Sequence, residues 1–255
     1  MMRLRCDFYS ESLGIGTAMT VLLPQSADGQ IGLAATTRER TPVLYLLHGL
    51  SDDDTIWTRR TSIERYASSL GLAVVMPQVG RSFYCDEVHG NRYWTFLSEE
   101  LPALVNSSFN VSSCREDTFV AGLSMGGYGA FKWALRQPWR FAAAAALSGS
   151  LDIAKPEREH ALPDLFRTIW GEGRRPANTD DDLLTLMARA EIADLPALWV
   201  GCGTEDFLLP DTHRFLHAAH ERGVHVTHEL PPGGHEWSLW DEQIRRVLHW
   251  LPLQP

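Results

Sequence analysis

The chain has 255 residues, with 23 Lys or Arg against 32 Asp or Glu, so its formal net charge is −9. Its 44% hydrophobic and 22% charged residues are typical of globular proteins. The acidic balance argues against nucleic-acid binding, because there is no excess of basic residues to replace counterions on a phosphate backbone. No apolar run reaches the ~20 residues of a membrane span, and the N-terminus lacks the apolar core of a signal peptide. We therefore expect a cytoplasmic protein with neither nucleic acid nor membrane as a partner.

The four cysteines, Cys6, Cys85, Cys114 and Cys202, lie far apart in the sequence and form no C-x-x-C pair. This spacing does not predict a zinc site. We expect free thiols that pack as small core residues, as buried cysteines commonly do. A disulfide between Cys85 and Cys114 stays open from the sequence, although a cytosolic protein rarely keeps one.

Apolar segments of strand length alternate with helix-like segments along most of the chain. The predicted elements, in order, are strands over Thr17–Leu23 and Pro42–Leu47, a helix over Ile56–Leu70, a strand over Leu72–Met76, a helix over Trp94–Ser107 with Pro102 as a potential kink, a strand over Asp117–Ala121, a helix over Met125–Arg136, strands over Phe141–Leu147 and Pro196–Cys202, a helix over Asp211–Arg222, a strand over Val224–Leu230 and a helix over Glu236–Leu251. The polar stretch Ser26–Thr41 predicts a hairpin loop. Strands that alternate with helices of this length predict an α/β fold, with a mostly parallel sheet and helices on both faces.

The segment from Asp152 to Asp194 departs from this rhythm, because it shows no clear strand. It contains Pro156, Pro163 and the turn sequence Gly171–Pro176. A long insertion within a compact domain commonly has a function, often as a lid over a site. We therefore predict one domain over residues 1–255, with a small cap insertion at about 152–194.

One motif with a defined chemistry lies between a predicted strand and a predicted helix. Gly122-Leu123-Ser124-Met125-Gly126 matches the pattern G-x-S-x-G, with the strand ending at Ala121 and the helix beginning at Met125. A nucleophile elbow requires this context, because the serine takes a strained backbone conformation and side chains at the flanking glycines would clash. A serine hydroxyl needs a base to accept its proton, so the motif predicts a histidine and an acid close to Ser124.

The acid and the histidine are expected in later loops, in the chain order serine, acid, histidine. Asp206 follows the strand that ends at Cys202, and His235 lies between the last predicted strand and the last helix. Both positions are at the carboxyl ends of strands, where Ser124 is also expected. We therefore predict a catalytic triad of Ser124, Asp206 and His235, with Glu205 as the alternative acid.

Such a triad also needs backbone N–H groups that stabilise the oxyanion of a tetrahedral intermediate. The Met125 N–H is one candidate, because it follows the nucleophile and lies at a helix N-terminus. The second donor is expected in the loop after an earlier buried strand, which reads His48-Gly49-Leu50. We predict that the Leu50 N–H completes the oxyanion hole and that His48 braces the loop rather than acting as a second base.

Four blocks of sequence surround these residues: His48–Asp53 (HGLSDD), Gly122–Ala130 (GLSMGGYGA), Cys202–Asp206 (CGTED) and Gly233–Trp237 (GGHEW). Together, from about Phe8 to Leu251, the chain resembles the tributyrin-esterase branch of the esterase D family. The resemblance implies an α/β-hydrolase fold, cleavage of short-chain acyl esters, and a relation to S-formylglutathione hydrolases and feruloyl esterases. It also implies the same triad and the same oxyanion hole.

Two other clusters are better explained without a metal. His213, His217 and His220 recur at helical spacing, but no carboxylate completes a metal motif, so a solvated helix face is favoured over a metal site. The run Asp52-Asp53-Asp54 lacks the frame of a calcium loop. It predicts a polar turn that caps the helix beginning at Ile56.

Four of the nine tryptophans, Trp57, Trp94, Trp170 and Trp237, fall in or beside loops expected around the nucleophile. They are the candidates to line a substrate pocket, and an apolar pocket would suit a neutral ester. Within the predicted cap, Arg174 and Arg175 are the candidates to hold a carboxylate of the substrate, although adjacent arginines commonly form a solvated turn.

We therefore expect a serine carboxylesterase that acts on small-molecule esters of short acyl chains and needs no metal or organic cofactor. The alternatives are an S-formylglutathione hydrolase, a feruloyl or acetyl-sugar esterase, and a hydrolase-fold binding protein without activity. Exposed cap surface leaves a homo-oligomer open.

Overall fold

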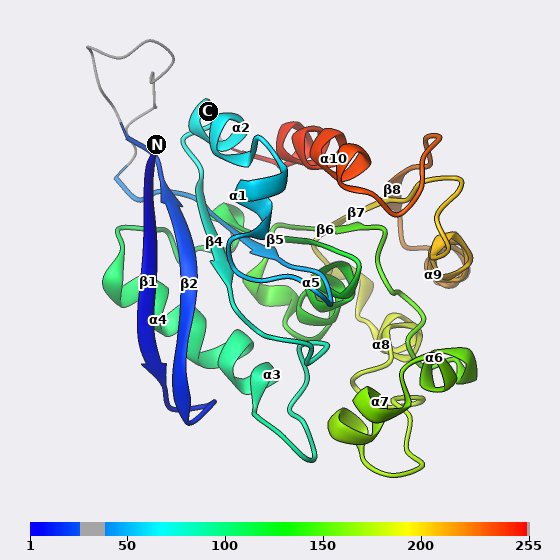
Figure 1. Ribbon diagram of the computed structural model, residues 1–255. Helices are drawn as coiled ribbons and strands as arrows, with labels where there is room; N and C mark the ends of the chain where they lie inside the picture. Colours follow the sequence, from blue (N-terminus) through cyan, green and yellow to red (C-terminus); the bar gives the residue numbers. More distant parts are fainter. Residues whose placement is uncertain (26–38, 254–255) are drawn as a thin grey trace.

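A computed structural model of the chain describes residues 1–25 and 39–253. It contains an eight-stranded sheet with the strand order β1-β2-β4-β3-β5-β6-β7-β8 (Figure 1). The strands are β1 (Met2–Ser10), β2 (Ile15–Leu23), β3 (Val43–Leu47), β4 (Ala73–Pro77), β5 (Thr118–Leu123), β6 (Ala143–Leu147), β7 (Ala197–Gly201) and β8 (Val226–Glu229). Strand β2 runs antiparallel to both β1 and β4, and the other neighbouring pairs are parallel.

Helices cover both faces of this sheet (Figure 1). One face is covered by α1 (Ile56–Arg60), α2 (Ile63–Ser68) and α10 (Trp237–Trp250), and the other by α4 (Leu101–Ser108), α5 (Met125–Arg136), α8 (Leu183–Arg189) and α9 (Leu209–Glu221). Successive side chains of β3 enter the two different cores: Leu44 and Leu46 pack on the first face, and Tyr45 and Leu47 on the second. This follows from the two-residue repeat of a strand. The predicted mostly parallel sheet with helices on both faces is confirmed.

Strand β1 is absent from the predicted elements. Charged Arg3, Arg5 and Asp7 alternate there with the less exposed Leu4 and Cys6, which is the two-residue pattern of a strand with one covered face. The strand pairs with β2 over its whole length. Charged side chains are typical of edge strands, because they discourage pairing with another sheet, and here they obscure the apolar signal.

The predicted single helix over Ile56–Leu70 is wrong, because the structure has α1 and α2 with a break between them. At the break, the Thr61 hydroxyl donates to the Trp57 carbonyl oxygen at 2.6 Å and accepts the first N–H of α2 at 3.2 Å. The Ser62 N–H donates to the carboxylate of Asp241, on α10, at 2.8 Å. Side-chain bonds of this kind satisfy backbone groups outside a helix, so α1 ends here.

The predicted helix around Pro102 is present but irregular. It comprises α3 (Tyr93–Thr95), a π-helical turn (Phe96–Glu100) and α4. Pro102 has no N–H to donate to the carbonyl of Ser98. That carbonyl oxygen instead accepts from Arg140 Nη2 at 3.2 Å, so the Ser98 carbonyl still has a donor.

The segment predicted as a cap, 152–194, contains α6 (Pro156–Ala161), α7 (Pro163–Trp170) and α8. Helix α8 packs against α5 and α9, and α6 and α7 lie beside it at the lower right of Figure 1. The division into a single domain with a cap stays a prediction.

All four cysteines are free, so the structure contains no disulfide between Cys85, which is buried, and Cys114, which is exposed. Among the described residues, no helix is both long enough and apolar enough to cross a membrane. Most of the predicted loop Ser26–Thr41, namely residues 26–38, lies outside the described residues.

Candidate active site

Ser124 occupies a strained turn between β5 and α5. Its backbone φ is +53°, a left-handed value that is uncommon for residues other than glycine. A Cβ at Gly122 would lie 2.4 Å from the backbone of Gly126, and a Cβ at Gly126 would lie 2.4 Å from the carbonyl oxygen of Leu47. The two glycines of the motif are therefore required by close backbone contacts around the serine, and backbone strain of this kind is concentrated at functional sites.

The structure brings Ser124, His235 and Asp206 together from distant parts of the chain. His235 Nε2 lies 3.1 Å from Ser124 Oγ, and His235 Nδ1 lies 2.9 Å from Asp206 Oδ2. The three residues follow β5, β8 and β7, so they all lie beyond the carboxyl ends of parallel strands. In the neutral imidazole, Nδ1–H donates to the carboxylate and Nε2 accepts the serine hydroxyl hydrogen. A serine held in this way can lose its proton as it attacks a carbonyl carbon.

Asp206 is buried and is stabilised as a carboxylate. Burial acts to raise its pKa, but hydrogen bonds from His235, the Leu208 N–H and the Ser148 hydroxyl outweigh burial and lower the pKa. The Leu208 N–H donates to Asp206 Oδ1 at 2.8 Å. The alternative acid, Glu205, is exposed. Asp206 is thus the acid that contacts the imidazole.

Two residues that the sequence analysis does not single out support the pair of Asp206 and His235. Ser148 is fully buried directly after β6, and its hydroxyl lowers the pKa of Asp206 and accepts the Trp240 Nε1–H at 3.0 Å. The Trp240 ring also packs edge-to-face on His235, with ring centroids 4.7 Å apart. In the sequence, only the position of Ser148 could have indicated this role, because it follows a strand at the same edge of the sheet as Ser124 and Asp206.

Leu50 and Met125, the two predicted oxyanion donors, both line the pocket that contains Ser124. Met125 is the first residue of α5, and the first N–H groups of a helix have no acceptor within it. Within residues 1–25 and 39–253, neither its N–H nor that of Leu50 donates to another backbone group. Both N–H groups are therefore free to bind an oxygen of a substrate.

The loop that carries Leu50 is held by His48. The Val79 N–H donates to His48 Nε2 at 3.1 Å, so the proton of the neutral ring lies on Nδ1, which donates to the Gly49 carbonyl oxygen at 2.8 Å. A trans peptide group points its N–H away from its carbonyl, so the Leu50 N–H points away from the His48 ring. The Tyr84 hydroxyl donates to the His48 carbonyl oxygen at 2.8 Å. Burial lowers the pKa of His48, which keeps the ring neutral and this arrangement intact.

A pocket of about 230 Å³ opens at Ser124. Its lining residues come from the loops after β3, β4 and β6, the elbow, the segment 152–194 and the loop before α9. They are Leu50, Phe83, Ser124, Met125, Ser150, Arg158, Ala161, Leu162, Phe207 and Leu208. Most of these side chains are apolar, and Phe207 leaves 62% of its surface exposed. Helix α6 thus forms part of the pocket wall.

None of the four predicted tryptophans, Trp57, Trp94, Trp170 and Trp237, lines this pocket. Trp57 and Trp237 pack edge-to-face against each other, with ring centroids 5.5 Å apart, on the α10 face of the sheet. Trp94 lies 5.0 Å from the ammonium group of a buried lysine, and Trp170 donates its Nε1–H to an aspartate carboxylate at 2.9 Å. These large rings complete the two hydrophobic cores, and the structure does not place any of the four in the wall of the pocket at Ser124.

The other predicted candidates also lie away from the pocket. Arg174 and Arg175 do not line it, and Arg175 Nε pairs with Glu159 at 3.4 Å. The three histidines of α9 are exposed. In the part of the chain that the structure describes, no three His, Cys, Asp or Glu side chains are grouped as ligands for a metal ion.

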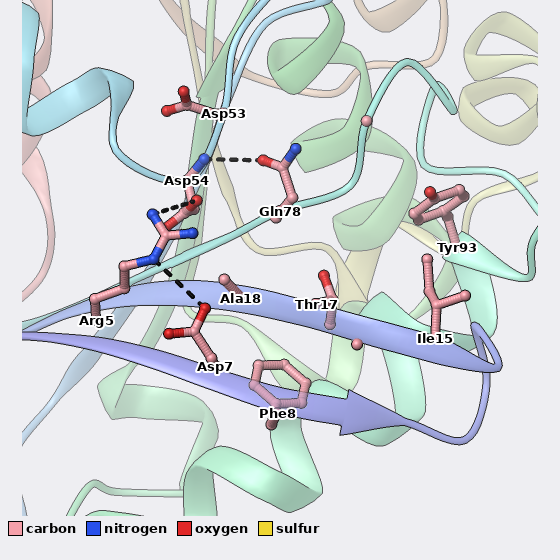
Figure 2. Close-up of a pocket in the computed structure, with 12 residues that line it drawn as sticks. Arg5, Asp7, Phe8, Ile15, Thr17, Ala18, Asp53, Asp54, Gln78 and Tyr93 are labelled. Carbon is pink, nitrogen blue, oxygen red and sulfur yellow. Dashed lines mark hydrogen bonds and ion pairs between the residues drawn. The ribbon is translucent and has the colours of Figure 1, made fainter.

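A wider hollow of about 680 Å³ lies between the β1–β2 hairpin and the aspartate turn that follows Leu50. Figure 2 shows Arg5 there between Asp7 and Asp54, with nitrogen–oxygen distances of 3.5 and 3.6 Å. The described residues that line this hollow include no serine, cysteine or histidine. It therefore lacks the paired nucleophile and base found at Ser124.

Comparisons with known proteins agree with this geometry. Residues 10–251 match the model of the family described as "Putative esterase". The chain is 28% identical to an acetyl esterase of Caldicellulosiruptor saccharolyticus, over 97% of both chains. Among solved structures, it is similar to FphF, a fluorophosphonate-binding serine hydrolase of Staphylococcus aureus, at 34% identity and a TM-score of 0.87 over 99% of both chains. It is also similar to the S-formylglutathione hydrolase FrmB of Staphylococcus aureus, at 33% identity and a TM-score of 0.82 over 98% of both chains.

These matches cover nearly the whole chain. The predicted α/β-hydrolase fold is confirmed by the likeness to serine hydrolases of that fold. With a family model that spans residues 10–251, the chain belongs to the esterase family and is a carboxylic ester hydrolase.

Proposed function

We propose that the protein hydrolyses short-chain acyl esters through a covalent acyl-enzyme on Ser124. The observation that carries this proposal is the unbroken series of hydrogen bonds from Ser124 Oγ through His235 to the buried carboxylate of Asp206. A hydrolase-fold binding protein without activity is disfavoured, because such a protein would not need a serine at a strained φ of +53° next to a free base. The sequence blocks place the chain, in our proposal, in the tributyrin-esterase branch of the esterase D family.

In the proposed mechanism, Ser124 Oγ attacks the carbonyl carbon of the ester while His235 Nε2 accepts the hydroxyl proton. Asp206 holds the imidazole in the required tautomer and stabilises its charged form. The N–H groups of Leu50 and Met125 stabilise the oxyanion, and one such donor is worth roughly 2.7–4 kcal/mol. His235 then protonates the leaving alcohol. A water molecule that gives its proton to His235 attacks the acyl-enzyme and releases the acid.

The pocket supports a short acyl chain and leaves a thioester as the second candidate substrate. Its volume of about 230 Å³ is below the ~300–1,000 Å³ of pockets that enclose drug-sized ligands. The likeness to the S-formylglutathione hydrolase FrmB supports a formyl thioester, whose acyl group is the smallest possible. Both candidates use the same nucleophile and the same oxyanion donors, and they differ in the acyl group and in the leaving group, which is an alcohol or a thiol.

A substrate panel separates these candidates. We expect kcat/KM for 4-nitrophenyl acetate and butyrate to exceed that for the octanoate by at least about tenfold, because each poorly accommodated methylene costs about 1–3 kcal/mol. S-formylglutathione is measured beside them, and a higher kcat/KM for the thioester would favour the second candidate. An absence of turnover with every activated ester and with the thioester would contradict both.

Labelling with a fluorophosphonate identifies the nucleophile. Mass spectrometry should find the phosphonyl adduct on the peptide that contains Ser124, and Ser124→Ala should abolish it. Ser150 lines the same pocket, so Ser150→Ala is the matched control, in which the adduct should remain on Ser124. An adduct that survives Ser124→Ala would refute the assignment.

A further inference from the structure

Arg158, on α6, lines the wall of the pocket that contains Ser124. Its side chain is 16% exposed, although most arginines lie at the protein surface. Among the described residues that line the pocket it is the one with a permanent charge. A guanidinium at this position is close enough to a bound ester to distinguish esters by their charge.

The guanidinium of Arg158 is held in place before any substrate binds. Its Nη2 donates to Asp211 Oδ2 at 2.8 Å, and its Cζ lies 5.8 Å from the centre of the Phe207 ring. Phe207 also lines the pocket and packs against His235, with ring centroids 4.6 Å apart. A cation fixed on two sides loses little conformational freedom when it binds an anion, and this favours affinity.

The ion pair with Asp211 does not remove the positive charge from this wall of the pocket. Asp211 is fully buried and also pairs with Lys155 and with Arg214, whose Nη2 lies 3.1 Å from Oδ1. Arg214 pairs in addition with Asp152 at 2.5 Å. Three cations thus share two carboxylates, so the cluster carries one excess positive charge.

Arg158 also has N–H groups without a protein acceptor. Its Nη1 donates to no acceptor among the described residues and is not one of their buried unpaired atoms, so it is the group left to bind a molecule in the pocket. The Nε–H is unpaired but fully buried, so a molecule in the pocket does not reach it. A carboxylate suits Nη1, because a hydrogen bond between two charged groups is stronger than a neutral one.

The geometry points to Arg158 as a specificity-determining residue that favours short-chain esters or thioesters carrying a carboxylate on the acyl or the leaving group. This inference rests on the proposed function of Ser124. It replaces the predicted carboxylate site at Arg174 and Arg175, which lie outside the pocket. The competing explanation is that Arg158 only fastens α6 to Asp211, in which case neutral and anionic esters would be affected equally by its replacement.

Two matched pairs of esters test the inference. Mono-4-nitrophenyl succinate against 4-nitrophenyl butyrate places the carboxylate on the acyl side. 4-Acetoxybenzoate against its methyl ester places it on the leaving-group side. The measured quantity is the ratio of kcat/KM for the anionic ester to kcat/KM for the neutral one, and a partly unfolded variant does not alter this ratio.

In Arg158→Gln, we expect the ratio to fall about tenfold or more for at least one pair, as for the loss of a hydrogen bond to a charged group. The pair that responds identifies the side of the ester that Arg158 contacts. Arg158→Lys keeps the charge and should lose less. Arg174→Gln removes the same charge from an exposed position on the same segment, and its ratios should stay within about threefold of wild type.

Unchanged ratios in Arg158→Gln, with both esters still hydrolysed, would overturn the inference and leave the proposed function intact. An equal fall in Arg174→Gln would also overturn it, because the effect would then come from net charge. If the wild-type protein hydrolysed none of the four esters, the proposed function itself would fail.

Discussion

Replacement of His48 tests how the loop that carries Leu50 is positioned. The ring makes two hydrogen bonds, from Nδ1–H to the Gly49 carbonyl oxygen at 2.8 Å and from the Val79 N–H to Nε2 at 3.1 Å. In His48→Asn, the amide N–H lies near the position of Nδ1 and can still donate to Gly49. In His48→Gln, the amide oxygen lies near the position of Nε2 and can still accept from Val79. Each variant therefore keeps one of the two bonds.

The magnitude follows from which backbone group is released. In His48→Gln, the Gly49 carbonyl oxygen loses the bond from Nδ1–H, at a cost of about 0.5–1.5 kcal/mol, and keeps only the longer one from the Asp52 N–H at 3.3 Å. The peptide group that ends in the Leu50 N–H is therefore held less firmly. An oxyanion donor is worth roughly 2.7–4 kcal/mol, and we expect about half of this to be lost. The fall in kcat should be about tenfold to thirtyfold. KM should change little, because the donor acts mainly on the transition state.

The assay compares kcat and KM for 4-nitrophenyl butyrate in wild type and both variants, with circular dichroism as a check on folding. His48→Asn should keep kcat within about threefold, because it retains the bond to Gly49, and should lose about 1 kcal/mol of stability through the bond to Val79. Two results would refute the proposal that His48 orients the peptide group between Gly49 and Leu50. One is a folded His48→Gln that keeps the wild-type kcat, and the other is an equal loss of activity in both variants.

Three further predictions concern the elbow, the acid and the response to pH. Gly126→Ala places a Cβ 2.4 Å from a carbonyl oxygen of β3, and it should lower the free energy of unfolding by about 3 kcal/mol in urea denaturation. Gly16→Ala is the control, because no atom lies within 4 Å of its Cβ, and it should not show this loss. Ser148→Ala leaves the buried Trp240 N–H without its acceptor and removes the hydroxyl that lowers the pKa of Asp206. We expect kcat/KM to fall about tenfold, and an unchanged value would contradict the support that we assign to Ser148. Burial lowers the pKa of His48 in the folded protein. Below the ordinary histidine pKa of about 6.5, the unfolded chain therefore binds more protons than the folded one. The free energy of unfolding should then fall on acidification by at most about 1.4 kcal/mol per pH unit. The difference in the free energy of unfolding between pH 7.5 and 5.5, measured by urea denaturation, should be smaller in His48→Asn than in wild type. An equal difference would assign the pH dependence to other groups.

The elbow could be predicted from the sequence because its constraints are local. The left-handed φ of Ser124 and the contact that a Cβ at Gly122 would make with the Gly126 backbone act within five residues, and only the limit on Gly126, set by Leu47, comes from another strand. Such constraints admit few residue types, so they leave a recognisable motif. Asp206 and His235 could be predicted from their positions after strands, because parallel strands bring their carboxyl ends to one edge of the sheet.

The side chains that support His235 could not be predicted in this way, as Trp237 and Trp240 show. They lie three residues apart on α10, so their side chains lie on neighbouring parts of the helix surface. Trp240 packs on His235 and bonds Ser148, whereas Trp237 packs on Trp57. The angle at which α10 crosses the sheet decides which ring reaches the site, and that angle depends on packing along the entire helix rather than on the residues near His235.

Arg158 extends the same reasoning to charge. Within the segment 152–194 nothing local separates it from Arg174, since both are arginines in a polar stretch without a strand. The difference is Asp211, which lies 53 residues after Arg158 and is buried on α9. Asp211 reaches Arg158 only when α9 has packed in the fold, where it contacts α8, so the charge of the pocket wall arises from the assembled fold. For this reason the paired neutral and anionic esters test a property that no motif in the sequence encodes.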